Sequence, residues 1–201
     1  MRVFFVRHGQ TLANLQHSSS SWNHDSPLTE DGRGQVKLAA ELLRASFERP
    51  VKIIASPLLR TRQTADILAS QLNTGPVLVD DRLKEANVGY WGQRTVDDVN
   101  DDFRKLSTAE RPTLRPPHGE TWLEIGSRVA QLVEEMSAGP SLTLVLVSHD
   151  APIRFGVGTL LHEDSVKWSD RKFPTGSISL LEASGNGWRE VYIGKTQGNL
   201  R

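Results

Sequence analysis

An arginine and a histidine stand together near the beginning of the chain, where an apolar run ends. Residues 2–6 have β-type composition, and Arg7, His8 and Gly9 follow them directly. At the carboxyl end of a strand in an α/β sheet the backbone opens into a crevice where ligands bind, and a glycine there lets a substrate approach the main chain. Arginine offers a charged planar fork that matches phosphate oxygens, and histidine is a nucleophile or proton carrier near neutral pH. The triplet predicts anion chemistry; the alternative is a strand end with two solvated polar residues.

Two further apolar runs end in residues of the same kind. Residues 142–149 close on His149, and residues 51–55 are followed by a segment of helical composition that contains Arg60 and Arg62. Continuous apolar runs are typical of parallel strands covered on both faces. Because parallel strands share one direction, His8, His149 and Arg60 are expected at the same sheet edge. Arg62 lies two positions further along the helix and faces elsewhere, so it is not expected to contact the ligand.

Five segments along the chain form a recognisable pattern in a fixed order. They are Arg7 to Thr11 with Asn14, Ser56 to Ala65, Leu83 to Glu85 with Gly89 and Trp91, Gly119 to Thr121, and Val147 to His149 with Ile153 and Arg154. This pattern resembles the histidine phosphatase superfamily, which also contains cofactor-dependent phosphoglycerate mutase. The resemblance covers residues 2 to about 182. It implies an α/β sheet with helices on both faces, a phospho-histidine intermediate and no metal.

The chemistry of such a protein requires a nucleophile and a cluster of positive charge. Phosphoryl transfer spreads charge over the equatorial phosphate oxygens, so catalysis depends mainly on positioning and electrostatic stabilisation. A neutral His8 is expected to attack phosphorus, while Arg7, Arg60 and His149 stabilise the charge. Water then breaks the phospho-histidine, so that one slow displacement becomes two faster ones. The sequence leaves open which ring nitrogen of His8 attacks.

A proton donor is also needed, because an alkoxide is a poor leaving group. By resemblance, Glu85 matches the acid of the family, and the same carboxylate could then deprotonate the incoming water. A carboxyl group near an anionic substrate is expected to have a raised pKa. The alternative for Glu85 is a surface salt bridge to Arg82 or Lys84.

Three more residues complete the expected set of substrate contacts. The family pattern implies that the amide of Asn14 donates to a phosphate oxygen, although an asparagine at this place could instead cap a helix. Gln10 stands where many relatives carry glutamate, and Asp150 stands where glycine is common. The substrate-binding set is therefore expected to contain the following residues: Arg7, Gln10, Asn14, Arg60, His149 and Asp150.

Composition limits the function classes further. The chain has 201 residues with 24 Lys and Arg, 24 Asp and Glu, and no cysteine. Zero net charge disfavours electrostatic binding of nucleic acid, and the absence of cysteine excludes disulfides, thiolate zinc sites and cysteine nucleophiles. No apolar run approaches the ~20 residues that cross a bilayer. A cytoplasmic protein is expected, with a small phosphorylated molecule as its partner, no cofactor, no metal, no nucleic acid and no membrane. The sequence leaves open whether it is a monomer or a homodimer.

The order of elements predicts one α/β domain over residues 1–201. It is expected to hold a mostly parallel sheet with helices on both faces, an antiparallel edge strand and a small cap inserted at about residues 89–118. Helices are predicted at residues 35–47, 59–71 and 121–137, the last with Thr121 as N-cap. A short strand is predicted at residues 77–79, and a hairpin of residues 178–182 and 188–193 turns at residues 184–187. The inserted segment is rich in charge and proline and shows no strong apolar period.

Several functions fit this set of residues. The first is a phosphomonoesterase, and the second is a mutase that returns the phosphoryl group to its substrate. Hydrolysis is favoured because the dimeric mutases are longer and because residues 11–28 lack their loop rich in glycine and tryptophan. The third function is a non-catalytic phospho-ligand binder, which is disfavoured because every catalytic residue of the pattern is present. A metal site of His8, His149 and Asp150 is weaker still, since the neighbouring arginines would repel a cation.

Selectivity for one substrate is expected to come from aromatic and arginine side chains at the rim. These are Trp22, Trp91, Trp122, Arg94, Arg104, Arg111 and Arg115, with His24 and His118 as further candidates. His17 and His162 are expected at the surface. The set is compatible with a phosphorylated sugar, a nucleotide or an aromatic phosphate.

Overall fold

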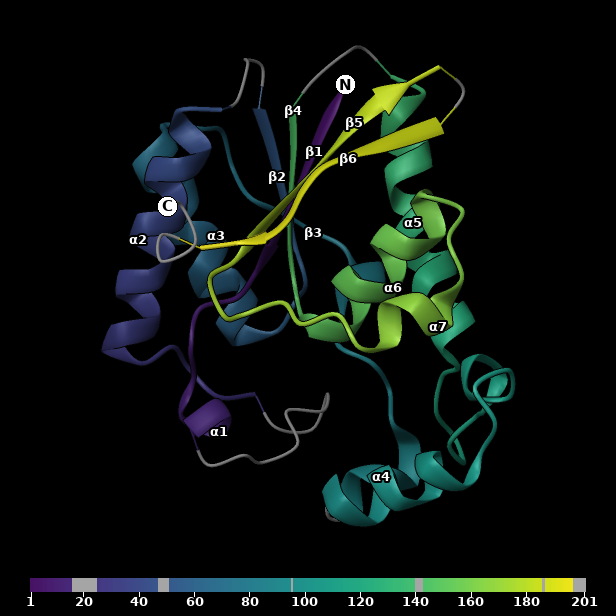
Figure 1. Ribbon diagram of the computed structural model, residues 1–201. Helices are drawn as coiled ribbons and strands as arrows, with labels where there is room; N and C mark the ends of the chain where they lie inside the picture. The colour runs from purple at the N-terminus through teal and green to yellow at the C-terminus, as the bar shows by residue number, and fades with distance from the viewer. Residues whose placement is uncertain (16–24, 47–50, 95, 140–142, 186, 197–201) are drawn as a thin grey trace.

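A mixed sheet forms the centre of the protein (Figure 1). The computed structural model describes residues 1–15, 25–46, 51–94, 96–139, 143–185 and 187–196. Within these ranges the sheet has six strands in the order β3-β2-β4-β1-β5-β6. Their bounds are Arg2–Arg7 for β1, Val51–Ala55 for β2, Leu78–Val79 for β3, Thr143–Ser148 for β4, Ile178–Ser184 for β5 and Gly187–Lys195 for β6. β1, β4, β2 and β3 are parallel, whereas β5 and β6 are antiparallel, as expected.

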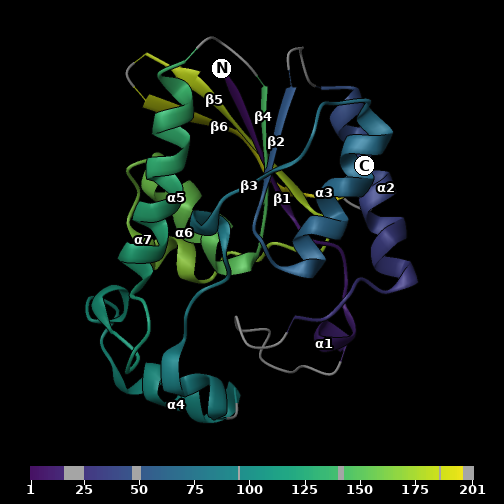
Figure 2. The same cartoon turned by 180° about the vertical axis from the view of Figure 1, so that it is seen from behind.

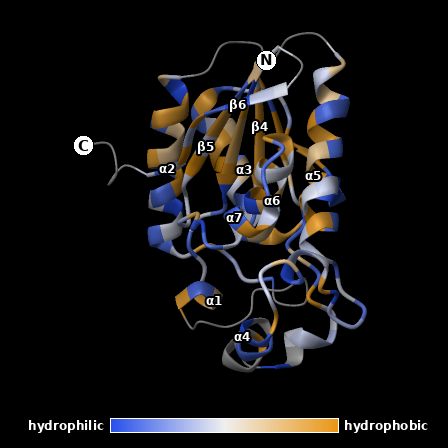
Figure 3. Ribbon diagram, turned by 45° about the vertical axis from the view of Figure 1, so that its right-hand side comes forward, coloured by the Kyte–Doolittle hydropathy of each residue, from blue (hydrophilic) through white to orange (hydrophobic). Residues whose placement is uncertain are grey.

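Helices cover both faces of the sheet, which confirms the predicted fold class. α2 (Glu30–Arg44) and α3 (Leu59–Leu72) lie on one face. α5 (Trp122–Ser137), α6 (Asp150–Leu160) and α7 (Ser165–Ser169) lie on the other, as Figures 1 and 2 show from opposite sides. In Figure 3 the hydrophobic strands stand between helices whose outward faces are hydrophilic.

The alternation of side chains along β1 divides the core into two parts. Phe4 and Val6 belong to the cluster that contains residues of α2 and α3, while Val3 and Phe5 belong to the cluster that contains residues of α5 and α6. Successive side chains of a strand point to opposite faces, so a central strand covered twice must be apolar throughout. This requirement explains why the strand is a continuous apolar run that ends abruptly at its polar residues.

Side-chain caps set where two of the predicted helices begin. Thr121 is the N-cap of α5, as predicted, and forms a capping box with Glu124. Such a cap contributes about 1 kcal/mol. α2 begins at Glu30, five residues earlier than predicted, because the Thr29 hydroxyl accepts from the Gly32 amide and the first turn is acidic.

The segment expected to form a cap lies at the end of the sheet toward which β1, β2 and β4 run (Figures 1 and 2). It contains the 3₁₀ turns η2 (Gly89–Gln93) and η3 (Arg111–Thr113) and the helix α4 (Val96–Lys105). Our sequence reading missed α4 because most of its residues are polar. The spacing of Val96, Val99 and Phe103 was the available helical signal.

Two short elements and the hairpin complete the described part of the chain. α1 (Leu12–Leu15) follows β1, and the 3₁₀ turn η1 (Asp81–Leu83) follows β3. The predicted hairpin is present, with β5 paired to β1 and β6 at the sheet edge. Among the helices in the described ranges, none has the length and apolar character needed to cross a membrane.

Candidate active site

His8 and His149 meet at the carboxyl ends of neighbouring parallel strands. Arg7 of β1 is in register with Ser148 of β4, so the residue that follows each of them emerges at the same place. The two imidazole rings have centroids 5.2 Å apart and meet edge to face at 64°. Both residues are buried, with 1% and 0% of their surface exposed. The sheet register therefore produces the pair of histidines that the sequence predicted.

A backbone hydrogen bond selects the tautomer of His8. Its Nδ1 lies 2.8 Å from the carbonyl oxygen of Gly9. A carbonyl oxygen only accepts, so Nδ1 carries the hydrogen and Nε2 keeps its lone pair. Burial, followed by the positive charges of Arg60 and Arg7, lowers the pKa of His8 to about 3. The ring is neutral at physiological pH, and Nε2 is the nitrogen that can attack an electrophile.

Gly9 is required by the packing of α2. A Cβ at this position would lie 2.4 Å from the carbonyl oxygen of Gly32, and the Gly9 amide donates to Thr64 Oγ1 at 3.2 Å. The sequence reading expected this glycine to admit a substrate. The structure shows that the first turn of α2 approaches this glycine closely, and its role in substrate access stays a prediction.

Ser56 holds the second histidine. His149 Nε2 lies 2.9 Å from Ser56 Oγ, which also accepts from the Leu58 amide at 3.4 Å. Burial, followed by the charges of His8, Arg60 and Arg7, holds the pKa of His149 well below its usual range. Within the described residues, His149 Nδ1 is buried without a hydrogen-bond partner. When the Ser56 hydroxyl donates to Nε2, Nδ1 carries a hydrogen that a bound anion can accept.

Arg7 and Arg60 bring positive charge to the histidines from two elements. Arg60, in the first turn of α3, has no exposed surface, and its Nη1 lies 3.3 Å from Asp25 Oδ1. Burial lowers the pKa of the Arg60 guanidinium, while Glu85 and Asp25 act in the opposite direction. Arg7 donates from Nη1 to the Phe173 carbonyl. These contacts hold the two arginines near His8, as the sequence predicted from the end of the first strand and from the helix that follows residues 51–55.

Glu85 is half-buried and carries a perturbed carboxyl group. Burial, together with the negative charge of Asp150, raises its pKa, although the Ala86 amide, Arg60 and Arg7 oppose this shift. The Ala86 amide donates to Glu85 Oε1 at 2.8 Å. A carboxyl group in this environment can hold a proton and release it.

The cations named in the alternative reading of Glu85 have other partners. Arg82 pairs with Asp80 at 2.8 Å and with Glu135 at 2.7 Å, and Lys84 pairs with Asp81 at 2.8 Å.

The three supporting residues have different environments. Asn14 lies in α1, where its Oδ1 accepts from the Thr11 amide and hydroxyl at 3.0 Å each. The oxygen is thus occupied locally, and the amide nitrogen is the group left for a phosphate contact. Gln10 is turned toward α2, where its Oε1 accepts from the Thr29 hydroxyl at 3.0 Å.

Asp150 is the first residue of α6 and lies between two arginines. Its carboxylate pairs with Arg154 and stands 3.6 Å from Arg7 Nη1. It therefore orients Arg7 and adds negative charge beside Glu85. The role of Asp150 as a direct substrate contact stays a prediction.

Several of the predicted rim residues form ion pairs or ring contacts with neighbouring side chains. The ion pairs are Arg94 with Asp102 at 2.7 Å, Arg104 with Asp101 at 2.5 Å, and Arg115 with Glu124. Trp122 stacks on Phe155 with centroids 4.9 Å apart, and the exposed His118 packs against Tyr90 at 4.8 Å. Two of the candidates, Trp22 and His24, lie outside the described residues, as does His17, which was expected at the surface.

The described residues contain no group of three or more His, Asp or Glu side chains arranged to hold a metal ion. The positive charge around His8 comes from arginine side chains. The arrangement places a neutral imidazole, two guanidinium groups and a carboxyl group with a raised pKa near one another.

The chain belongs to the histidine phosphatase superfamily, branch 1, whose family model matches residues 3–196. The probable phosphoglycerate mutase GpmB of Yersinia pestis is 34% identical over 167 residues, which cover 80% of this chain and 75% of that protein. The solved structure of mycobacterial glucosyl-3-phosphoglycerate phosphatase in complex with VO3 is 28% identical and has a TM-score of 0.83, covering 97% of this chain and 99% of that one. Phosphoserine phosphatase from Entamoeba histolytica has the same fold, with a TM-score of 0.85 at 23% identity over 99% of each chain.

Sequence reasoning missed several residues that shape the site. Ser56 and Thr64 lie inside one of the five family segments, where the pattern gives them no role, and Asp25 lies in none of these segments. Their signal was weak, because a hydroxyl or carboxylate in a turn reveals its partner only when distant segments meet. Glu120, quoted as part of a motif, and Arg128 were likewise left without a function.

Proposed function

We propose that the protein is a phosphomonoester hydrolase that acts through a phospho-histidine on a small phosphorylated metabolite. The observation that supports this most directly is the state of His8. Its ring is neutral, its Nδ1 is hydrogen-bonded to the Gly9 carbonyl, which leaves the lone pair on Nε2, and the ring packs against that of His149 and is influenced by the charges of Arg60 and Arg7. In the first step Nε2 attacks phosphorus, the P–N bond forms, and the P–O bond to the leaving alcohol breaks.

Arg60, Arg7 and His149 stabilise the charge that develops on the phosphoryl oxygens. Arginine presents parallel N–H donors to two oxygens, which fixes the direction of the phosphoryl group as well as its charge. His149 Nδ1 adds a neutral donor when Ser56 donates to Nε2. The low pKa of both histidines keeps them unprotonated before substrate binds.

Glu85 donates its proton to the leaving alkoxide and then accepts one from water. The raised pKa of this carboxyl group suits the first task, and the ionised form that remains suits the second. Water attacks phosphorus, the P–N bond breaks, and inorganic phosphate leaves with His8 neutral again. One carboxyl group thus serves both half-reactions.

Leaving-group dependence tests the role of Glu85. Glu85→Gln should lower turnover of alkyl phosphates by about a hundredfold, because general acid catalysis contributes on that order. p-Nitrophenyl phosphate, whose leaving group needs little protonation, should lose much less. Equal losses on both substrates with an unchanged pH profile would instead indicate that Glu85 only holds the site together.

Release of phosphate from a panel of phosphorylated sugars, sugar acids, amino acids and nucleotides tests the function as a whole. Rapid quenching with labelled substrate should trap an acid-labile, base-stable phospho-enzyme. EDTA should leave the rate unchanged, because all positive charge in the proposed mechanism belongs to side chains. A loss of activity on chelation that one divalent metal restores would contradict the mechanism.

A phosphoglycerate mutase activity is the second candidate, supported by the named relative at 34% identity. Both reactions use the same phospho-histidine and differ in whether water or a second substrate oxygen attacks it. The panel is therefore assayed with and without a bisphosphoglycerate primer. Primer-dependent isomerisation that outpaces phosphate release would identify a mutase, and primer-independent phosphate release would identify a phosphatase.

A further inference from the structure

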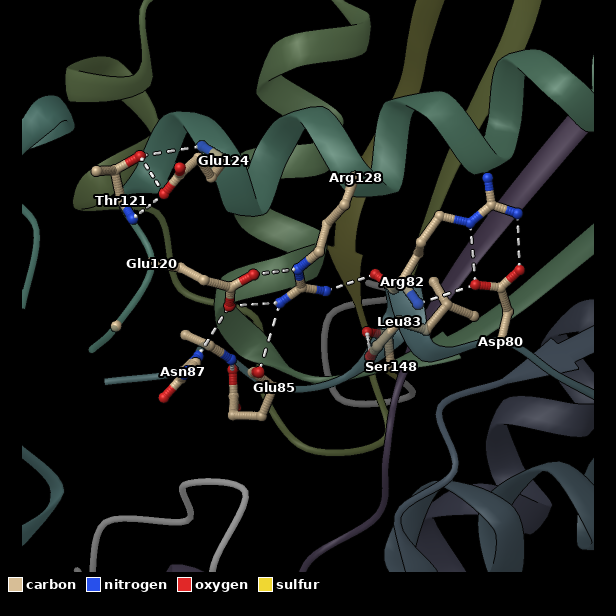
Figure 4. Close-up of polar contacts among 12 residues, drawn as sticks. Asp80, Arg82, Leu83, Glu85, Asn87, Glu120, Thr121, Glu124, Arg128 and Ser148 are labelled. Atoms are coloured by element: carbon tan, nitrogen blue, oxygen red, sulfur yellow. Dashed lines mark hydrogen bonds and ion pairs between the residues drawn. The ribbon is translucent and has the colours of Figure 1, made fainter. Parts of the chain in front are cut away.

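The segment that carries Glu85 is held in place by side chains from two other elements (Figure 4). Arg128 of α5 donates from Nη1 to the Arg82 carbonyl and from Nη2 to the Glu85 carbonyl at 3.4 Å. Ser148, at the end of β4, donates from its hydroxyl to the Leu83 carbonyl at 2.7 Å. The backbone is therefore fixed at Glu85 itself and on the residues before it.

Glu120 fixes the orientation of Arg128. Its two carboxylate oxygens pair with Arg128 Nε at 2.9 Å and with Nη2 at 3.2 Å, which is a two-point contact with a defined direction. The same Oε2 accepts from the Asn87 amide at 2.9 Å. The exposed fractions of the two side chains are only 15% and 20%, so water screens the pair weakly. Glu120 thus holds the guanidinium and also the backbone that follows Glu85.

Glu120 also stands at the base of the segment 89–118. The Glu120 amide donates to the Asn87 carbonyl at 2.8 Å, and the Tyr90 amide donates to the Pro117 carbonyl at 3.1 Å. Gly89 has φ +52°, and a Cβ there would lie 2.0 Å from the Pro117 carbonyl oxygen. The two ends of the segment are therefore joined, and Glu120 connects them to Arg128.

We propose that Arg128 and Glu120 are positioning residues that hold Glu85 in its acid–base position and connect it to the base of the segment 89–118. This inference rests on the proposed function, because it assigns Glu85 the proton transfer. Neither residue is assigned a contact with substrate. A proton carrier must lie within hydrogen-bond reach of the oxygen that it protonates, so a shift of about 1 Å in its backbone is costly.

Arg128→Lys tests the proposal with the charge retained. One ammonium group cannot occupy both oxygens of Glu120 and both carbonyls at once, so the segment should relax while the ion pair partly persists. Turnover of an alkyl phosphate should fall by about tenfold, and turnover of p-nitrophenyl phosphate by less than about twofold. Glu120→Gln is the second variant, because it removes the charge but keeps the size, and it should give the same imbalance.

A double-mutant cycle shows whether the effect passes through Glu85. In the Glu85→Gln background, Arg128→Lys should reduce turnover of the alkyl phosphate by less than about twofold further, because the function that it supports is already lost. A full tenfold loss in that background would overturn the proposal. Equal losses on the two substrates when Arg128→Lys is made in the otherwise wild-type protein would overturn it as well.

Arg82→Lys is the matched control. Arg82 lies three residues before Glu85 and forms two ion pairs, but its side chain is directed to Asp80 and Glu135. The control should leave the ratio of rates on the two substrates unchanged. If Arg82→Lys shifts that ratio as strongly as Arg128→Lys does, any disturbance of the backbone near Glu85 is enough to change the ratio, and the specific role of Arg128 is wrong.

Amide hydrogen exchange over residues 83–90 gives a readout that does not require activity. Exchange at Asn87 should rise in Arg128→Lys and Glu120→Gln and stay unchanged in Arg82→Lys, because the Asn87 amide is bonded to Glu120. Unchanged exchange in the first two variants would overturn the proposal. If the wild-type protein releases no phosphate from any substrate while exchange responds as expected, the proposed function is wrong, whereas the positioning of the backbone around Glu85 by Arg128 and Glu120 is confirmed.

Discussion

The floor of the site and the segment 89–118 beside it are built in opposite ways. In the floor, His8, His149 and Arg60 expose 1% of their surface or none, and each is placed by the end of a strand or the first turn of a helix. In the segment, Arg104 and its partner Asp101 are 73% and 59% exposed. Buried polar groups are restricted in geometry, because an unpaired or misplaced one costs free energy. Exposed ion pairs contribute little to stability and tolerate substitution. We infer that the floor determines the reaction and that the segment determines which substrate enters.

The largest effect is expected from removing the nucleophile in the floor. His8→Ala should reduce turnover by at least about a thousandfold and abolish the trapped phospho-enzyme, because the proposed mechanism forms the P–N bond on His8 Nε2. The matched control is His162→Asn, which changes an exposed histidine grouped with Met1 and Trp188 at the opposite end of the sheet. Undiminished turnover in His8→Ala, measured by phosphate release, would contradict the assignment.

Exchange of the buried arginine should cost less than loss of the nucleophile. Arg60→Lys keeps the charge but loses the two-pronged fork, so kcat/KM should fall roughly ten- to a hundredfold, and inhibition by vanadate should weaken. Arg62 lies two residues away on the exposed side of α3, so the variant Arg62→Lys serves as the control. If both variants keep wild-type kcat/KM and vanadate inhibition, Arg60 is structural and the contrast between floor and segment loses its basis.

Acid should destabilise the floor through its neutral histidines. The pKa of His8 is about 3 in the folded protein and about 6.5 when unfolded, so between these values the unfolded chain binds a proton that the folded chain does not. Stability is therefore lost as pH falls below about 6.5. For His8 this loss is on the order of 2 kcal/mol between pH 7 and pH 5.

The free energy of unfolding is measured with urea at pH 7 and pH 5 in the absence of phosphate. Its decrease between these two pH values should be smaller in His8→Asn than in wild type by the amount given above for His8. His162→Asn should lose stability as wild type does. An acid loss in His8→Asn equal to that of wild type would show that His8 is not held neutral by the fold.

The smallest effect on the chemistry is expected in the segment 89–118. Arg94→Gln breaks an ion pair with Asp102 in which both side chains are about one-third exposed. Vanadate inhibition and turnover of p-nitrophenyl phosphate should change by less than about twofold, because partly exposed pairs contribute little. The order of KM values across the substrate panel is where a change should be seen. A large loss on p-nitrophenyl phosphate would show that the segment takes part in the reaction.

The sequence predicted the floor better than its surroundings, and the reason is physical. Strands covered on both faces must be apolar, so β1 and β4 were visible as runs, and their polar ends marked His8 and His149. Thr121 was recognised as an N-cap because a capping signal is local. These features depend on residues close together in the chain.

Contacts between distant segments could not be predicted in the same way. Ser56 meets His149 across 93 residues, and Arg128 meets Glu85 across 43, with no periodic pattern to indicate either contact. Nothing in the sequence indicates that Gly32 approaches Gly9. α4 was missed because its polar composition hides a short apolar period.

The pairing of β1 has a consequence for the order in which the protein can acquire activity during synthesis. β1 lies between β4 and β5, so its hydrogen-bonding neighbours are Thr143–Ser148 and Ile178–Ser184. β1 ends at Arg7, whereas the strands that pair with it begin at Thr143 and Ile178, and synthesis proceeds at only about 5–20 residues per second. Until residues 143–184 have been synthesised, β1 is an apolar strand without its partners, and such long-range pairing folds slowly and exposes the chain to aggregation. The candidate active site should therefore form in one late step, when β4 and β5 close the sheet around β1.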